Sequence, residues 1–153
     1  MSTLHTAASV DPTRSSTLPL ANRLVRGAVA GLVGGMVFGM MMQMMGMITT
    51  IAMLVGSHSV PVGWLVHLVV SAGLGAGFGL VVGTRVGTWP AGLGLGVAYG
   101  MVWWVLGGLI AMPLALGMPV MHLDVMAWES LMGHMIYGAV LGLVAHLLGR
   151  HSA

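Results

Sequence analysis

The sequence predicts an all-α fold: an integral membrane four-helix bundle whose Gly-rich spans pack tightly. Hydrophobic residues make up 58% of the 153-residue chain and charged residues only 5%, whereas soluble domains carry about 25% charged residues. Several apolar stretches reach the roughly 20 residues that a helix needs to cross a bilayer. Within these stretches glycines recur every four residues, a pattern typical of helices that pack closely in lipid.

The first part of the chain differs in composition from the rest. Residues 1–22 are polar, rich in Ser and Thr, and contain Asp11-Pro12 and Pro19. They lack the apolar core of a cleaved signal peptide. We therefore expect a disordered polar tail on the cytoplasmic side, followed by a single four-span membrane domain over residues 23–150.

The predicted spans cover residues 24–47, 61–82, 91–111 and 128–148. The apolar pattern of the first span continues to Val55. A helix of that length would exceed the hydrocarbon thickness of about 30 Å. Two alternatives follow: a helix that tilts or protrudes, or a helix that breaks near Gly46.

The arginines predict the orientation of the bundle. With four spans, all five fall on one side, and they are Arg14, Arg23, Arg26, Arg85 and Arg150. The opposite side carries Asp124 and Glu129. Because positive residues collect in cytoplasmic segments, both termini are predicted to be cytoplasmic.

Composition excludes several classes of function. The formal charge is +2, but the scattered arginines form no basic patch, so we expect no nucleic-acid partner. The chain has no Cys, which excludes disulfides, iron–sulfur clusters and cysteine nucleophiles. No nucleophile–base pair or carboxylate pair has a usable spacing, so the chain is not expected to be an enzyme.

Small residues four positions apart form a ladder in every predicted span. The ladders are Gly27, Gly31, Gly35 and Gly39; Ser71, Gly75, Gly79 and Gly83; Gly92, Gly96 and Gly100; and Gly138 and Gly142. Such ladders let helix backbones approach closely. We favour packing within one chain, with a homo-oligomer through the ladders as the alternative.

Two histidines begin such ladders. His67 is followed at +4 and +8 by Ser71 and Gly75, and His134 is followed in the same way by small residues. Each imidazole therefore faces neighbouring helices, and the predicted topology puts both in the outer half of the membrane. A polar residue inside a membrane is a functional hypothesis, although a His can also simply hydrogen-bond across a helix interface.

Methionines in the first span complete a candidate metal site. Met40, Met44 and Met47 lie on the side of the helix away from the glycine ladder. Thioethers and imidazoles are ligands for Cu(I), so the predicted site combines these methionines with His67 and His134, and copper is its expected ion. Methionine as an ordinary apolar filler is the alternative. Glu129, His122 and Asp124 are further polar candidates.

Residues from His67 onward resemble the YagU-type family of small bacterial inner-membrane proteins of unknown function. The shared positions are His67, Ser71, Gly77-Phe78-Gly79, Pro90, Gly92, Tyr99-Gly100, Pro113, Pro119, Asp124, Trp128-Glu129 and Gly133-His134. The resemblance covers residues 60–150. It implies a bundle in the bacterial inner membrane in which His67 and His134 are functional, and it implies no reaction.

Three functional hypotheses follow from these features. The first is a small multi-pass membrane protein that handles a proton or a soft metal ion through an outer-half His/Met site. The second is a non-catalytic accessory or scaffold subunit in which the histidines only pack. The third is a b-type haem protein with His67 and His134 as axial ligands.

Overall fold

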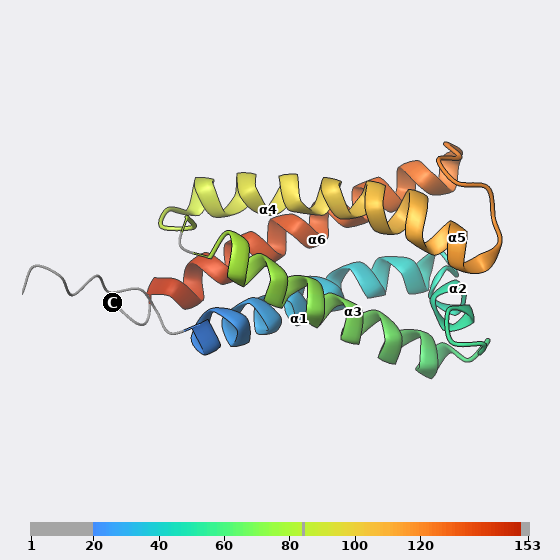
Figure 1. The fold of residues 1–153 in the computed structure, drawn as a ribbon, viewed down its shortest axis with the longest axis horizontal. Helices are drawn as coiled ribbons and strands as arrows, with labels where there is room; N and C mark the ends of the chain where they lie inside the picture. Colours follow the sequence, from blue (N-terminus) through green and yellow to red (C-terminus); the bar gives the residue numbers. More distant parts are fainter. Residues whose placement is uncertain (1–19, 84, 151–153) are drawn as a thin grey trace, which may run out of the picture.

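The computed structural model describes residues 20–83 and 85–150. The described elements are α1 (Leu20–Met44), α2 (Ile48–Met53), α3 (Val60–Val81), α4 (Trp89–Trp103), the π-helix η1 (Trp104–Ala111), α5 (Met112–Leu116) and α6 (Val125–Arg150). Four segments of this described chain are long and apolar enough to cross a membrane: Leu20–Met44, Val60–Val81, Trp89–Leu116 and Val125–Arg150. The predicted all-α bundle of four spans is confirmed (Figure 1).

The first span breaks at Gly46. α1 ends at Met44 and α2 begins at Ile48. Between them Gly46 has a φ of 71°, a left-handed conformation that costs glycine no steric strain. Of the two alternatives for this span, the structure has the break, and α2 folds back against the start of α3 near Gly63.

Several predicted boundaries differ from the structure. α1 begins at Leu20, so the last three residues of the predicted 1–22 tail are helical, and residues 1–19 lie outside the described residues. The third span does not stop at Ala111 but continues through η1 and α5 to Leu116. Pro113, in the first turn of α5, does not end it: the carbonyl oxygen of Leu109, which the missing N–H of Pro113 leaves open, accepts from the N–H of Met121 instead.

Two antiparallel helix pairs form by close contact at glycines. α1 packs on α3, and α4 packs on α6 (Figure 1). A Cβ atom on Gly31 would lie 2.8 Å from Cα of Gly75, and a Cβ atom on Gly96 would lie 3.0 Å from Cα of Gly142. Any larger residue would force these backbones apart.

The two pairs are joined along α1 and α6. The ring of Phe38 fills a notch left by Gly133, where a Cβ atom would overlap the ring. Gly34 lies against Tyr137, and a Cβ atom there would be 2.9 Å from the carbonyl oxygen of Tyr137. Phe38 and Tyr137 are both buried, so this interface is part of the apolar core.

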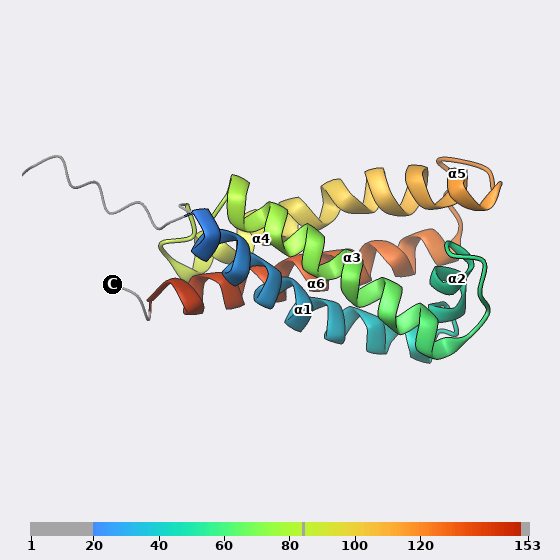
Figure 2. The same ribbon diagram turned by 60° about the horizontal axis from the view of Figure 1, so that its bottom comes forward.

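α3 and α4 meet through side chains. The hydroxyl of Tyr99 donates to the carbonyl oxygen of Leu74 over 2.8 Å, and the Tyr99 ring contacts Phe78 edge-on. Figure 2 shows α4 and α5 diverging from α3 toward the end where α2 lies. The bundle is therefore more open between these helices than between α1 and α6.

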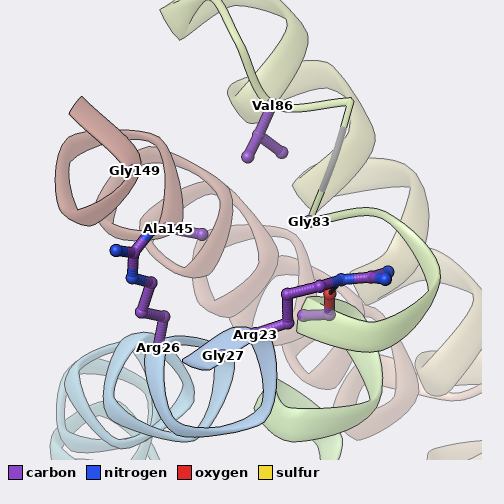
Figure 3. A pocket seen from close by; sticks show the side chains of 8 residues that line it. Arg23, Arg26, Gly27, Gly83, Val86, Ala145 and Gly149 are labelled. Atoms are coloured by element: carbon purple, nitrogen blue, oxygen red, sulfur yellow. Dashed lines mark hydrogen bonds between the residues drawn. The ribbon is translucent and has the colours of Figure 1, made fainter. Parts of the chain in front are cut away.

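The arginine-bearing end of the bundle is closed by helix capping. Arg23 donates from Nε to the carbonyl oxygen of Gly79 over 3.3 Å and from Nη2 to that of Leu80, while Arg85 donates to that of Val81 over 3.1 Å. The carbonyls at the end of a helix carry partial negative charge, so cations stabilise them. In Figure 3, Arg23 and Arg26 extend away from each other around a small pocket at this end.

Candidate functional site

His67 lies on α3 inside the bundle. It is buried, and its Nε2 atom is 2.9 Å from the carbonyl oxygen of Gly35 on α1. A carbonyl oxygen only accepts hydrogen bonds, so Nε2 carries the proton, and in the neutral ring Nδ1 keeps a lone pair. The rings of Phe38 and Trp64 contact the imidazole edge-on.

The indole of Trp64, which contacts His67, also makes a hydrogen bond to α1. Its Nε1 atom donates to Oε1 of Gln43 over 3.2 Å. Gln43 is exposed near the end of α1. This pair places a polar contact between His67 and the end of the bundle away from the arginines.

His134 occupies α6. Its Nδ1 atom lies 2.8 Å from the carbonyl oxygen of Ser130, one turn earlier, and 3.4 Å from the hydroxyl of Ser130. By the same argument Nδ1 carries the proton and Nε2 keeps the lone pair. A Cβ atom on Gly108 of η1 would lie 3.6 Å from Cε1 of His134, so the π-helix borders this imidazole.

Phe38 contacts both imidazoles. Its ring centroid is 5.6 Å from that of His67 and 4.9 Å from that of His134, with edge-on geometry in both contacts. Among the described residues no ring contact joins the two histidines directly. The two histidines thus share Phe38 as a neighbour.

The predicted methionine ligands do not join this site. Met40 and Met44 are 58% and 86% exposed on the outer side of α1, while His67 is buried. Met47 lies in the turn after α1 and packs against the apolar core. Met40 and Met44 therefore lie on the exposed side of α1, away from the buried His67, and Met47 lies beyond the end of α1.

Met42 is the methionine of α1 that is buried, at 4% exposure. It follows Ala30, Gly34 and Phe38 at spacings of four, and all of them are buried. This stripe runs beside the glycine ladder and faces α6. This stripe was not predicted, although its four-residue spacing is visible in the sequence beside the glycine ladder.

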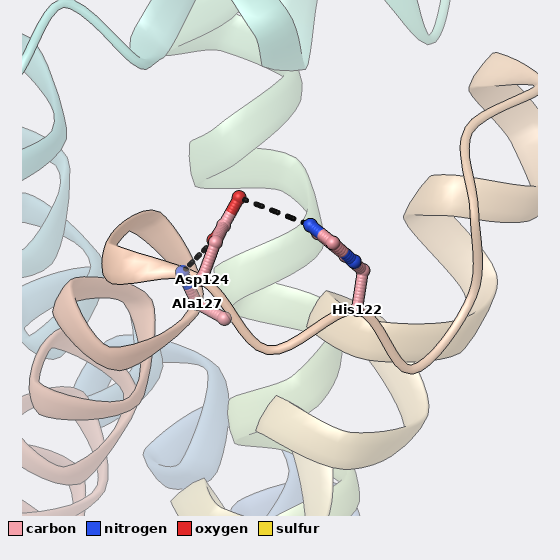
Figure 4. Close-up of polar contacts among 3 residues, drawn as sticks. All are labelled: His122, Asp124 and Ala127. Carbon is pink, nitrogen blue, oxygen red and sulfur yellow. Dashed lines mark hydrogen bonds and ion pairs between the residues drawn. The ribbon is translucent and has the colours of Figure 1, made fainter.

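The remaining polar candidates lie at the end of the bundle that α2 and the segment 117–124 form. Asp124 accepts from the backbone N–H of Ala127 over 2.8 Å and so caps α6, while Nε2 of His122 is 3.9 Å from its other carboxylate oxygen (Figure 4). Glu129 is half-buried on α6. The described residues contain no cluster of three or more His, Asp or Glu that could bind a metal.

Tyr137 and His146 were not singled out from the sequence. The hydroxyl of Tyr137 donates to the carbonyl oxygen of Ser71 over 2.9 Å, and Nδ1 of His146 donates to that of Val86 over 2.8 Å. Both residues are buried. His146 provides a buried histidine at the arginine end that contacts neither His67 nor His134.

Comparisons of this chain with protein-family models, with curated proteins and with solved structures find no match.

Proposed function

We propose that this multi-pass membrane protein takes up and relays protons through His67 and His134. The observation that carries the proposal is that each imidazole, buried at His67 and half-buried at His134, donates one N–H to a backbone carbonyl and keeps a second nitrogen that has no hydrogen-bond partner in the described part of the chain. A neutral imidazole with a free lone pair can accept a proton. Ionisable residues inside a membrane commonly belong to proton relays.

A proton fits this geometry better than a metal ion. The soft ligands Met40 and Met44 face outward, and the ring of Phe38 lies against both imidazoles. A single copper ion, or a haem iron with two axial histidines, would require both imidazole nitrogens to reach one centre. A proton needs only one nitrogen at a time, and it would pass the Phe38 ring by way of a transient water.

The proposal includes the setting of the protein. We place it in a bacterial inner membrane with both termini cytoplasmic, in line with its arginine distribution and its resemblance to the YagU-type family. It would act without catalysing a reaction.

The second candidate is a scaffold subunit. It is favoured by the role of Phe38, which fills the notch at Gly133 and would serve packing alone. The ladder glycines lie against helices of the same chain, so a homo-oligomer would have to use another surface. In this candidate the histidines only satisfy carbonyls at helix interfaces.

Proton flux into proteoliposomes distinguishes the two candidates. The purified full chain is reconstituted with a pH-sensitive dye inside, and a potassium gradient with an ionophore sets the membrane potential. We expect the wild type to conduct protons, and the double variant His67→Gln, His134→Gln to fall to the level of empty liposomes. His146→Gln is the matched control, because it removes a histidine outside the pair that is as buried as His67, and it should conduct like the wild type.

Phe38→Leu provides a second measurement. The smaller side chain should let protons pass the barrier faster and raise the flux while the histidine pair stays intact. Equal flux in the wild type and the double histidine variant, or no flux above empty liposomes in the wild type, would rule out the relay and leave the scaffold candidate.

A further inference from the structure

Methionines are confined to one half of this bundle. None occurs in residues 20–31, 71–100 or 139–150, which form the half nearer the arginines. The exposed large apolar residues of that half are Val, Leu and Trp, such as Val29, Leu93 and Leu147. The other half exposes many thioethers, and these are Met36, Met40, Met44, Met53, Met101, Met118, Met121, Met126, Met132 and Met135.

This asymmetry is not explained by lipid contact. Val and Leu face lipid as well as Met does, and a thioether used only as an adaptable apolar group would serve both halves of the bundle equally. What distinguishes Met from Leu chemically is its sulfur, a ligand for soft metal ions. The distribution therefore points to a role of sulfur at the end away from the arginines.

One segment at this end adds an imidazole to the thioethers. Between α5 and α6 the chain reads Met118-Pro-Val-Met121-His122-Leu-Asp124. The side chains of Met118, Met121 and His122 are all exposed. Met121 has a φ of 56°, and it is the one non-glycine residue with a positive φ in the described chain. Such a conformation is costly for a residue with a side chain, so something holds it there.

Backbone hydrogen bonds hold both methionines in place. The N–H of Met118 donates to the carbonyl oxygen of Pro113 over 2.9 Å, and the N–H of Met121 donates to that of Leu109 over 2.9 Å. Both acceptors belong to the last turns of the third span. The segment is thus tied to the bundle at the two residues whose thioethers it presents.

Asp124 orients the imidazole. One carboxylate oxygen is fixed by the backbone N–H of Ala127, and the other lies 3.9 Å from Nε2 of His122 (Figure 4). The carboxylate faces Nε2, so Nδ1 is the ring nitrogen that stays available to a ligand. A histidine that binds a metal through one nitrogen and faces a carboxylate with the other is the usual arrangement in metal sites.

We propose that the segment 118–124 binds one Cu(I) ion through the thioethers of Met118 and Met121 and the Nδ1 atom of His122, with Asp124 as a positioning residue. Two soft sulfurs and one imidazole suit Cu(I), whereas the hard ions Mg²⁺ and Ca²⁺ need oxygen ligands. This site is separate from His67 and His134 and does not depend on the proposed proton relay.

The test is Cu(I) binding by the full chain in nanodiscs. The protein is titrated under anaerobic, reducing conditions against a chromophoric Cu(I) chelator. We expect one Cu(I) per chain, and loss of this site in the triple variant Met118→Leu, Met121→Leu, His122→Gln. Asp124→Asn should weaken binding about 10- to 100-fold, as is usual for a residue that orients a ligand. Asn still caps a helix, so α6 keeps its start.

Matched controls come from the same end of the bundle. Met132→Leu and His58→Gln remove an exposed thioether and an exposed imidazole outside the segment, and both should bind Cu(I) like the wild type. The double variant His67→Gln, His134→Gln should also bind normally, which separates this proposal from the proton relay. Unchanged affinity in the triple variant, or an equal loss in the controls, would overturn the proposed site.

Discussion

At the scale of single residues, glycines in this bundle leave some helix carbonyls accessible to side-chain donors. Three of the helix carbonyls that accept a side-chain donor share one feature; they are Gly35, which accepts from His67, Ser71 from Tyr137, and Gly79 from Arg23. The residue four positions later is a glycine in each case: Gly39, Gly75 or Gly83. A helical side chain leans back over the preceding turn, so its absence leaves the carbonyl open to a second donor.

The close approach at Gly31 can be tested by a single methyl group. A Cβ atom there would overlap the carbonyl oxygen of Ser71 and lie 2.8 Å from Cα of Gly75, whereas one on Gly73 would meet nothing within 4 Å. We expect Gly31→Ala to lower the thermal unfolding temperature in detergent. Gly73→Ala should keep or raise it, because Ala favours a helix over Gly by about 1 kcal/mol. Equal unfolding temperatures for the two variants would show that α1 and α3 do not pack as closely as described.

At the scale of elements, Pro113 changes the hydrogen bonding at the end of the third span. Pro113 has no N–H, so the carbonyl of Leu109, four residues earlier, loses its helical partner. The N–H of Met121 takes this place over 2.9 Å. Nearby, the indole of Trp104 donates to the carbonyl oxygen of Ala127 over 3.0 Å. The π-helix η1 and the segment after α5 are thereby fastened to each other and to α6, and π-helical turns frequently mark functional regions.

Replacing this proline should loosen the segment that it organises. In Pro113→Ala the new N–H can bond to the carbonyl of Leu109 and displace the N–H of Met121. We expect faster amide hydrogen exchange over residues 117–124 and, if the copper site is as proposed, weaker Cu(I) binding. Pro90→Ala is the control, since Pro90 lies in the first turn of α4, where no helical N–H is needed. Unchanged exchange in Pro113→Ala would mean that the segment holds its shape without this bond.

The elements themselves were largely predictable, and the reasons lie in bilayer physics. A stretch of about 20 apolar residues has few alternatives to a spanning helix, so four spans could be derived from the sequence. The break at Gly46 could only be offered as an alternative, because tilt and breakage relieve excess length equally well. The π-helix η1 was not predicted, since its apolar sequence has no feature that distinguishes it from an α-helix.

The candidate site was predictable only in part. The small-residue strips correctly placed His67 and His134 on inward faces, because polar side chains avoid lipid. Which groups would lie between them depends on how α1 meets α6, and the sequence carries no direct signal for that pairing. Phe38 was therefore missed, and the exposed Met40 and Met44 were assigned to the site on chemistry alone.

The whole molecule contains two similar hairpins. The contacts of Gly31 with Ser71 on α1 and α3 correspond to those of Gly96 with Gly138 on α4 and α6. In each hairpin a histidine lies four residues before the small residue on the second helix, at His67 or His134. Both hairpins start from the arginine end of the bundle. The two histidines therefore occupy equivalent positions in the two hairpins.

The orientation of the whole bundle decides which compartment the two proposed sites face. All arginines of the described chain lie at one end, and the positive-inside rule predicts that this end is cytoplasmic. The natural chain has no Cys, so single cysteines report without background. Suitable positions are the exposed Gly87 at the arginine end and the exposed Ser59 and Leu123 at the other end. A Cβ atom on Gly87 meets no neighbour within 4 Å.

We expect Ser59→Cys and Leu123→Cys to react with a membrane-impermeant thiol reagent in intact bacterial cells, and Gly87→Cys to react only after the membrane is permeabilised. Labelling of all three after permeabilisation controls for access to the thiol. If Gly87→Cys reacts in intact cells and the other two do not, the bundle is inverted. The segment 118–124 would then meet cytoplasmic copper, and both histidines would take up protons from the cytoplasmic side.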